Sequence, residues 1–134
     1  MIKSISISTK SRAELCDVTS KIEDAVAESK AKRGICHLFI PHTTAAVTIN
    51  ENADPSVRRD ILHGLERALP FKGDYEHAEG NAAAHIKSSM IGTDKTILIE
   101  NGKLKLGTWQ GIFFCEFDGP RERTIFVGIT KLEE

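Results

Sequence analysis

Hydrophobic and polar residues alternate over residues 2–9, where serines separate Ile2, Ile5 and Ile7. A period of two residues is typical of a strand buried on one face, and the uneven spacing near Lys3 indicates a bulge. Residues 2–9 are therefore expected to form a half-buried strand.

The pattern then becomes helical. Ser11 and Glu14 have the spacing of a capping box, in which two side chains satisfy free amides at the start of a helix. An apolar stripe follows from Leu15 to Val26 and predicts a helix of about five turns. Gly34 is expected to follow its end, and no chemistry is assigned to this helix.

Turn and capping residues delimit further elements. Asp54 is a good N-cap and Pro55 suits the first helical position, so a helix is expected from here to Pro70. Asn101 and Gly102 suit the positive φ angles of a type I′ turn and predict a hairpin. Apolar runs predict the remaining strands, which cover residues 35–41, 46–49, 96–100, 103–106, 112–117 and 124–130.

The predicted order is strand, helix, two strands, two helices and four strands. Because strands and helices do not alternate regularly, this order favours an α+β fold with a largely antiparallel sheet. A sandwich and a barrel-like sheet are both compatible with the pattern, which does not define the topology.

Composition narrows the function classes. The 134 residues suffice for one domain with a core. The net charge of −1 does not indicate a strongly basic surface for binding nucleic acid or a membrane. We find no apolar run of membrane-spanning length and no signal-peptide pattern near residue 1. Three cysteines without a C-x-x-C pair predict reduced, buried thiols in a cytoplasmic protein.

A short helix is expected between Asn81 and Gly92. Asn81 is a good N-cap, Ile86 and Met90 form an apolar pair four residues apart, and Gly92 suits the end of the helix.

Two histidines flank the start of this helix. His77 lies on the incoming loop and His85 about one turn inside, and a sharp turn at Gly80 allows them to approach. With Ser88 and Ser89 on the same side as His85, the pair predicts a metal or acid–base site. Surface or hydrogen-bonded histidines are the alternative.

Other polar residues lie at strand ends or inside strands. His42, Thr43 and Thr44 follow a predicted core strand, where they either face a ligand or cap their own turn. Glu116 lies within an apolar strand and should be paired with Arg121, Arg123 or a histidine, because burying an unpaired carboxylate is costly. Trp109 either stacks on a heterocycle or anchors the core.

Three groups are interpreted as outside any site. His63 lies opposite the apolar stripe of its helix, and His37 lies earlier along its strand than His42. Arg58, Arg59 and Arg67 are expected to form a solvated face rather than a phosphate clamp.

Several motifs together resemble one known family. They are H-T-T-A-A-V-T-I-N-E at 42–51, A-D-P at 53–55, Y-E-H at 75–77, N-A-A-A-H at 81–85, L-G-T-W-Q-G at 106–111 and E-F-D-G-P-R at 116–121. This ordered set is similar to the YjbQ family, also called the secondary thiamine-phosphate synthase enzyme family, over nearly the whole chain.

The resemblance implies a single YjbQ-like domain over residues 1–134 with a compact, sandwich-like α+β fold that assembles as a homotrimer. It also implies thiamine-phosphate synthase activity, in which a hydroxymethylpyrimidine diphosphate is joined to a thiazole phosphate. Carried over by position, the polar motif residues of the family are His42, Thr43, Asn50, Asp54, His77, Asn81, His85, Gln110 and Glu116.

The mechanistic hypothesis places a divalent metal at His42, His77 and His85, a ligand set typical of catalytic zinc, with Mg²⁺ as an alternative for a diphosphate substrate. Glu116 or Asp54 would orient a ring N–H or bind metal-bound water. The remaining candidates would contact the substrate, with phosphate near the helix that begins at Asn81: Thr43, Thr44, Asn50, Asn81, Ser88, Ser89, Trp109, Gln110 and Arg121.

Two other functions use the same residues. One is a trimeric module that binds a phosphorylated metabolite or another small anion without converting it. The other is a metal-dependent hydrolase that activates water. The sequence does not separate these functions, and neither has a nucleic acid or a membrane as a partner.

Overall fold

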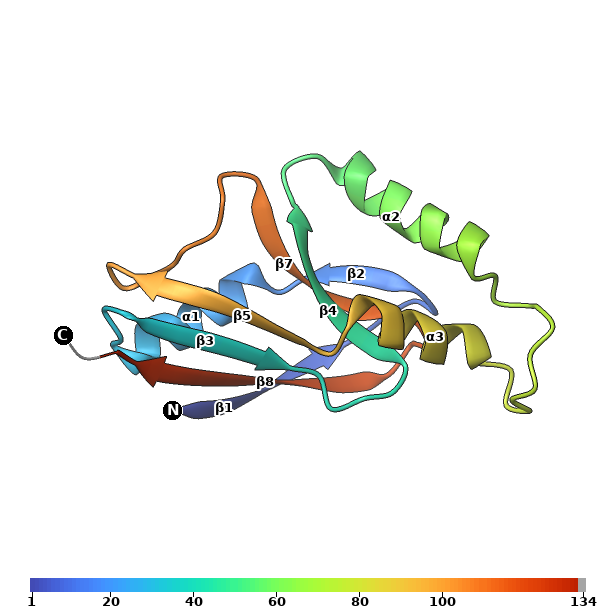
Figure 1. Ribbon diagram of the computed structural model, residues 1–134, viewed down its shortest axis with the longest axis horizontal. Coiled ribbons are helices and arrows are strands. Elements are labelled where there is room, and N and C mark those ends of the chain that lie inside the picture. Colours follow the sequence, from blue (N-terminus) through green and yellow to red (C-terminus); the bar gives the residue numbers. More distant parts are fainter. Residues whose placement is uncertain (133–134) are drawn as a thin grey trace.

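The computed structural model describes residues 1–132 and contains two antiparallel sheets and three helices (Figure 1). In chain order the elements are β1 (Ile2–Ser8), β2 (Glu14–Asp17), α1 (Thr19–Ser29), β3 (Gly34–Phe39), β4 (Ala45–Glu51), α2 (Pro55–Ala68), α3 (Ala82–Ile91), β5 (Asp94–Glu100), β6 (Lys103–Leu104), β7 (Gln110–Glu116) and β8 (Glu122–Lys131). The predicted α+β class with three helices is confirmed.

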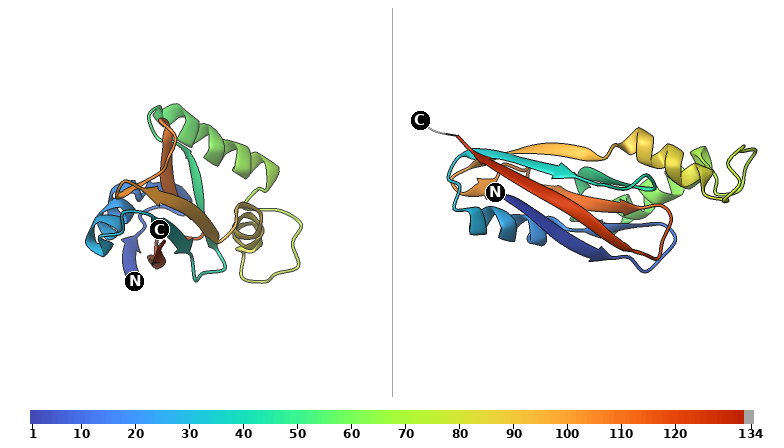
Figure 2. Two further views of the ribbon diagram at one scale, coloured as in Figure 1. Left: turned by 60° about the vertical axis from the view of Figure 1, so that its left-hand side comes forward. Right: turned by 90° about the horizontal axis from the view of Figure 1, so that it is seen from below.

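One sheet has the strand order β1-β8-β3-β5-β6 and the other has the order β2-β7-β4, and every pairing is antiparallel. Figures 1 and 2 show α1 toward the end that carries the C-terminus, whereas α3 and the preceding loop lie at the opposite end. The site candidates therefore have to be divided according to the end of the sheets that they occupy.

The central strand β7 is buried on both faces. Phe114 packs into the main core with Ile22 and Ile125, while Phe113 and Cys115 face a second cluster beneath α2 and α3. Alternate residues of one strand thus contribute to two cores, which explains why β7 reads as a continuous apolar run.

The helix predicted after Ser11 begins later than expected. Residues 14–17 form β2, in which Leu15 pairs with Cys115 of β7, and the helix starts only at Thr19. Glu14 does accept hydrogen bonds from the backbone N–H groups of Lys10 and Ser11, but it does so in a bend before a strand. Part of the capping-box contact therefore forms without the helix, and the buried Leu15 packs beside β7 instead.

Two local predictions are confirmed. Asp54 caps α2 by accepting the Ser56 backbone N–H at 2.9 Å, with Pro55 at the first helical position. Asn101 and Gly102 adopt φ angles of 55° and 76° between β5 and β6, as a type I′ turn requires. Within residues 1–132, no helix has the length and apolarity needed to cross a membrane.

The three cysteines are free thiols, and Cys36 and Cys115 lie in the core as predicted. Burial raises the pKa of the Cys36 thiol to about 11 and that of Cys115 to about 12. Burial, together with the nearby Glu14 and Glu116 carboxylates, raises the pKa of Cys16 to about 11. All three therefore remain as unreactive thiols at neutral pH.

We expect Ellman's reagent at pH 8 to react slowly with Cys36 and Cys115 in the native protein. Three equivalents should react after denaturation without reductant, because the thiols are protected by burial alone. Fewer than three free thiols in the denatured, unreduced protein would contradict this expectation and indicate a disulfide.

Candidate functional site

A buried ion pair lies where the end of β7 meets the start of β8. Glu116 has no exposed surface and Arg123 is 6% exposed. The Arg123 Nε–H donates to Glu116 Oε1 at 2.9 Å and the Arg123 Nη2–H donates to Glu116 Oε2. The prediction that Glu116 is paired is confirmed, and the partner is Arg123 among the three alternatives.

Two further donors form hydrogen bonds to the Glu116 carboxylate. Thr9 Oγ1 donates to Oε1 at 2.7 Å, and the Asp118 backbone N–H donates to Oε2 at 3.1 Å. Burial alone would raise the pKa of Glu116, but the hydrogen bonds from Arg123, Thr9 and Asp118 outweigh it and lower that pKa below the ordinary value. Glu116 is thus ionised and held by these donors, and its charge acts on the nearby His42 ring. Its predicted catalytic role stays a prediction.

The pair also fixes the loop between β3 and β4. The Arg123 Nη2–H donates to Thr44 Oγ1 at 2.8 Å, so the buried Thr44 hydroxyl is held by the ion pair. The neighbouring Thr43 is exposed.

A chain of polar contacts runs from this pair to α3. Asp118 accepts the Asn81 Nδ2–H at 2.9 Å and the Arg121 Nη2–H at 3.0 Å. Among residues 1–132 the buried Asn81 Oδ1 has no hydrogen-bond partner. A buried acceptor without a donor is rare in folded proteins, so this oxygen marks a position where a ligand or water proton would be favourable.

Asn81 precedes α3 but does not cap it with its side chain, which corrects the sequence prediction. The amide is held by Asp118 instead, and only the backbone oxygen of Asn81 binds the helix start, where it accepts the Ala84 N–H at 3.1 Å. The helix nevertheless ends at Gly92, which has a φ of 99°.

The buried face of α3 also differs from the expected one. Lys87 and Ser88 are buried, whereas Met90 is 66% exposed. Ser88 Oγ–H donates to the Ala45 backbone oxygen at 2.7 Å, and Ser89 Oγ–H donates to the His85 backbone oxygen at 3.0 Å. The O–H donor of each serine is therefore used within the helix or by β4, and each oxygen can still accept a hydrogen bond.

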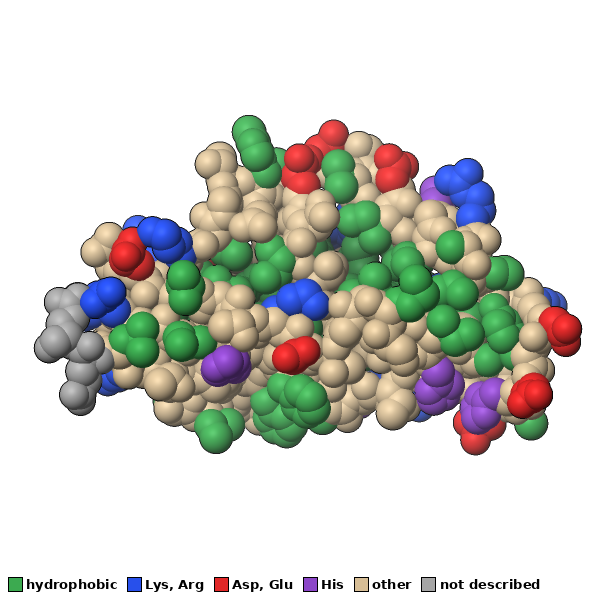
Figure 3. Space-filling view, viewed as in Figure 1, with side chains coloured by type: hydrophobic (Ala, Val, Ile, Leu, Met, Phe, Trp, Pro, Cys, Tyr) green, Lys and Arg blue, Asp and Glu red, His purple; other side chains and the backbone are tan. Residues whose placement is uncertain are grey.

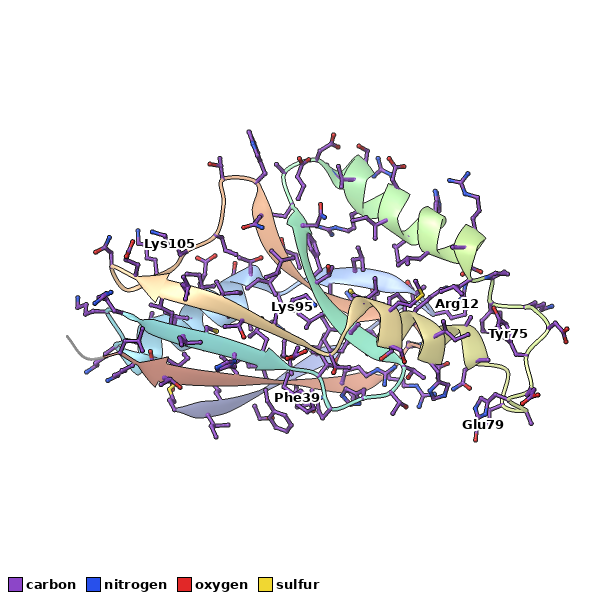
Figure 4. The ribbon with its side chains drawn as sticks, viewed as in Figure 1. Arg12, Phe39, Tyr75, Glu79, Lys95 and Lys105 are labelled. Carbon is purple, nitrogen blue, oxygen red and sulfur yellow. The ribbon has the colours of Figure 1, made fainter. Side chains whose placement is uncertain are left out.

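The structure brings His77 and His85 together. Their ring centroids are 5.1 Å apart and the rings are nearly perpendicular, at 88°. They line an open cavity of about 480 Å³ with Tyr75 and Ala82, and His77 Nε2 lies 3.7 Å from Glu79 Oε2. Figure 3 shows two histidine side chains beside acidic groups at this end, and Figure 4 places Tyr75 and Glu79 on the loop before α3.

His42 does not join this pair within one chain. Its Nε2 accepts the Thr124 backbone N–H at 2.9 Å, and burial, followed by the charge of Arg123, lowers its pKa. Residues 1–132 contain no group of three histidine, cysteine or acidic side chains that could hold a metal ion. His77 and His85 thus supply at most two protein ligands in a single chain.

Four other candidates lie at the far end of β4 and β7. Ala45 pairs with Glu116 at the end of these strands close to α3, here called the near end, and Glu51 pairs with Gln110 at the other end, the far end. Six residues of extended strand separate the two ends by about 20 Å. The four candidates at or beyond that end are Asn50, Asp54, Trp109 and Gln110.

Their local contacts are structural. Asn50 Oδ1 accepts the Glu51 backbone N–H, Gln110 Oε1 accepts the Gly107 backbone N–H, and Asp54 caps α2. Trp109 is 63% exposed, so it is not the core anchor that the sequence left open.

The remaining histidines lie apart from the pair, as predicted: His37 Nδ1 lies 3.1 Å from Thr96 Oγ1, and His63 is exposed on α2. Sequence reasoning missed two basic residues. Arg58 was expected in solvent, but its guanidinium lies 4.8 Å from the centre of the Phe113 ring and its Nε is buried. Lys87 was not singled out, although a lysine three residues after Ala84 shares the face that buries that alanine.

A model of the family described as UPF0047 protein YjbQ-like matches residues 3–132. The chain belongs to the YjbQ/UPF0047 family. A YjbQ/UPF0047 relative from Methanocaldococcus jannaschii, MJ1081, is 54% identical over 129 residues, covering 96% of this chain and 94% of that protein. The relative YugU from Bacillus subtilis is 47% identical over 128 residues, covering 95% and 97% of the two chains.

Solved YjbQ/UPF0047 structures have the same fold. The crystal structure of a family member from Clostridium acetobutylicum is 54% identical, covers 96% of this chain and 99% of its own, and has a TM-score of 0.94. A YjbQ-like protein from Sulfolobus solfataricus is 36% identical, covers 98% and 97%, and has a TM-score of 0.95. The names of these relatives give a family and no activity, so the function has to be argued from the site.

The Glu116–Arg123 pair yields a stability prediction. Arg123→Met should lower the free energy of unfolding by about 3–5 kcal/mol, because it leaves a buried carboxylate without its guanidinium. Arg121→Met removes an ion pair whose arginine is 54% exposed and should cost less than about 1 kcal/mol. Urea unfolding at pH 7 measures both values, and equal effects would show that burial of the first pair carries no additional energy.

Proposed function

We propose that this protein is an enzyme that acts on a small phosphorylated substrate at the His77–His85 pair. The observation that carries the proposal is the approach of these two rings beside an open cavity at the start of α3. Imidazole changes its protonation near neutral pH and can transfer protons or bind a metal, and two imidazoles in one cavity can divide these roles.

The start of α3 offers donors to an anion, whereas Asp74 and Glu76 line the same cavity with negative charge, so an anion has to lie on the α3 side. The first amides of a helix have no intrahelical partner and carry a partial positive charge, and Ala82 at the start of α3 lines the cavity. Arg121 is held near this helix start through Asp118 and Asn81. A phosphate would therefore find backbone N–H donors at α3 and the Arg121 guanidinium nearby.

The ring arrangement is compatible with two ligands of one metal ion. Imidazoles that bind the same tetrahedral zinc ion have ring centroids about 5 Å apart, close to the 5.1 Å between His77 and His85. We propose that this pair holds a divalent ion, zinc or Mg²⁺, whose third protein ligand comes from a neighbouring copy. Such an ion would neutralise charge on the phosphorylated substrate.

The resemblance favours the synthesis of thiamine phosphate as the reaction. The thiazole nitrogen would form a bond to the pyrimidine methylene carbon, while the carbon–oxygen bond to diphosphate breaks and diphosphate leaves with the electron pair. The donors at α3 and Arg121 would stabilise that leaving group. The exposed Trp109 could stack on a heterocycle only if another copy brings it to the histidine pair.

Replacement of each histidine tests this proposal. His77→Ala and His85→Ala should each lower turnover of the two thiamine precursors by about a hundredfold or more. His63→Ala, on the exposed side of α2, is the matched control and should leave the rate unchanged. Assays with and without chelator, together with metal analysis of untagged protein, separate a metal role from proton transfer.

Turnover unaffected by either replacement would refute the proposed site. Hydrolysis of simple phosphate esters with no coupling of the precursors would favour the hydrolase. Tight binding of the precursors without turnover would favour the non-catalytic module.

We further propose that the protein is a homotrimer. The outer face of the five-stranded sheet leaves Ile2, Phe39, Leu98 and Phe126 exposed, and apolar patches of this kind are typical of interfaces. Figure 4 shows Phe39 pointing away from the sheet. An assembly would also allow the far-end motif residues of one copy to meet the histidine pair of another.

Light scattering at micromolar concentration should therefore give a mass three times the 14.8 kDa of one chain. Replacing Phe39 by Glu should lower this mass, because a charge would be buried at the contact. A monomeric mass for the unmodified protein would refute both the trimer and a shared metal site.

A further inference from the structure

A buried lysine faces a second, smaller cavity on the other side of α3 from the histidine pair. Lys87 is only 2% exposed, although lysine is rarely buried without full compensation of its charge. The cavity has a volume of about 250 Å³ and lies between α2, α3 and the segment that joins β1 to β2. This position is independent of the cavity of about 480 Å³ that His77 and His85 line.

The Glu66 carboxylate forms ion pairs with two cations at this cavity, Lys87 and Arg12. Glu66 Oε2 accepts the Lys87 ammonium at 2.9 Å, while Glu66 Oε1 accepts the Phe71 backbone N–H and lies 3.5 Å from Arg12 Nη2. The side chain of Glu66 is 40% exposed, so its charge is shared with solvent. Figure 4 places Arg12 between α2 and α3, on the border of this cavity.

The positive charge exceeds the negative charge around the cavity. Lys87, Arg12 and Arg59 line it together with Glu66 as the only acidic residue among the described lining residues. Arg59 forms no salt bridge within residues 1–132. The Lys87 ammonium has three donors and makes one hydrogen bond among the described residues, so two donors remain for a ligand.

Most of the remaining wall is apolar, and His63 is the other polar residue among the described lining residues. Leu62 and Leu65 of α2 and Phe117 after β7 line the same cavity, and the Lys87 Nζ lies 5.9 Å from the centre of the Phe117 ring. A bare inorganic ion would leave this apolar wall unused. The wall suits a compact apolar body attached to an anionic group, as in many small-molecule sites.

We propose that this cavity binds a small organic anion, a phosphate monoester or a carboxylate. The anionic group contacts Lys87 and the guanidinium groups of Arg12 and Arg59, and the apolar body lies against Leu65 and Phe117. Glu66 holds the lysine in place in the free protein. Binding here requires neither the histidine pair nor a metal.

Titration with phenyl phosphate, benzoate and inorganic phosphate tests the proposal. Backbone amide signals of Ala13, Leu62 and Phe117 should shift in NMR spectra of the full-length protein as phenyl phosphate or benzoate is added. Whichever of phenyl phosphate and benzoate binds with the lower dissociation constant shows whether the cavity prefers a phosphate or a carboxylate. Inorganic phosphate should bind more weakly, because it cannot use the apolar wall; equal affinity would overturn the organic part of the assignment.

Variants locate the interaction. Lys87→Met removes the charge, keeps most of the length of the side chain and should weaken binding about tenfold or more. Arg59→Gln, on the surface of α2, should also weaken binding. Lys105→Met is the control, because it removes a different lysine–glutamate ion pair, Lys105–Glu100. Neither residue of that pair lines the cavity. Lys105→Met should therefore leave the dissociation constant unchanged.

Unchanged affinity in both Lys87→Met and Arg59→Gln would overturn the proposal, as would signal shifts confined to residues 75–86. His85→Ala should retain phenyl phosphate binding at Ala13 and Leu62 even if it abolishes turnover. Failure of this inference can thus be distinguished from failure of the proposed enzyme activity.

Discussion

The arrangement of the near end of the molecule depends on one buried ion pair. Glu116 and Arg123 are both removed from solvent, and such a pair is tolerated only when every oxygen and N–H group finds a partner. Those partners come from the segment after β1, the β3–β4 loop and the β7–β8 turn. One pair therefore links three connections, two of which also place a residue in an apolar core, Ile40 before β4 and Phe117 after β7. Asp118 extends these polar contacts to Asn81 before α3.

Local signals in the sequence predicted local structure well. The Asp54-Pro55 start of α2 and the Asn101-Gly102 turn depend on the backbone preferences of the residues themselves, and both predictions are confirmed. The predicted start of α1 was wrong because the Glu14 side chain, three residues after Ser11, can accept backbone N–H groups in a bend as well as at a helix start. Only pairing with β7, which is distant in the sequence, selects a strand there.

The candidate site likewise contains residues whose positions follow from local sequence and residues whose positions depend on long-range strand pairing. His77 and His85 are eight residues apart around one turn, so their approach could be predicted from the sequence. His42, Asn50 and Gln110 belong to motifs that are similar to those of the family, but sequence similarity does not say which motifs meet within one chain. The antiparallel register of β4 and β7 separates the last two from the histidines. The role of Lys87 was missed because a lysine in a helix is usually solvated.

The polar anchors on α3 have an evolutionary consequence. Ser88 binds the Ala45 backbone oxygen and Lys87 binds Glu66, so directional bonds act together with the buried alanines at 82–84 to set the rotation of this helix about its axis. Apolar contacts tolerate a small rotation, but hydrogen bonds do not. The exposed positions of α3, such as Met90, can therefore vary among homologues without moving His85, whereas a change at Ser88 would turn His85 away from the cavity that it lines.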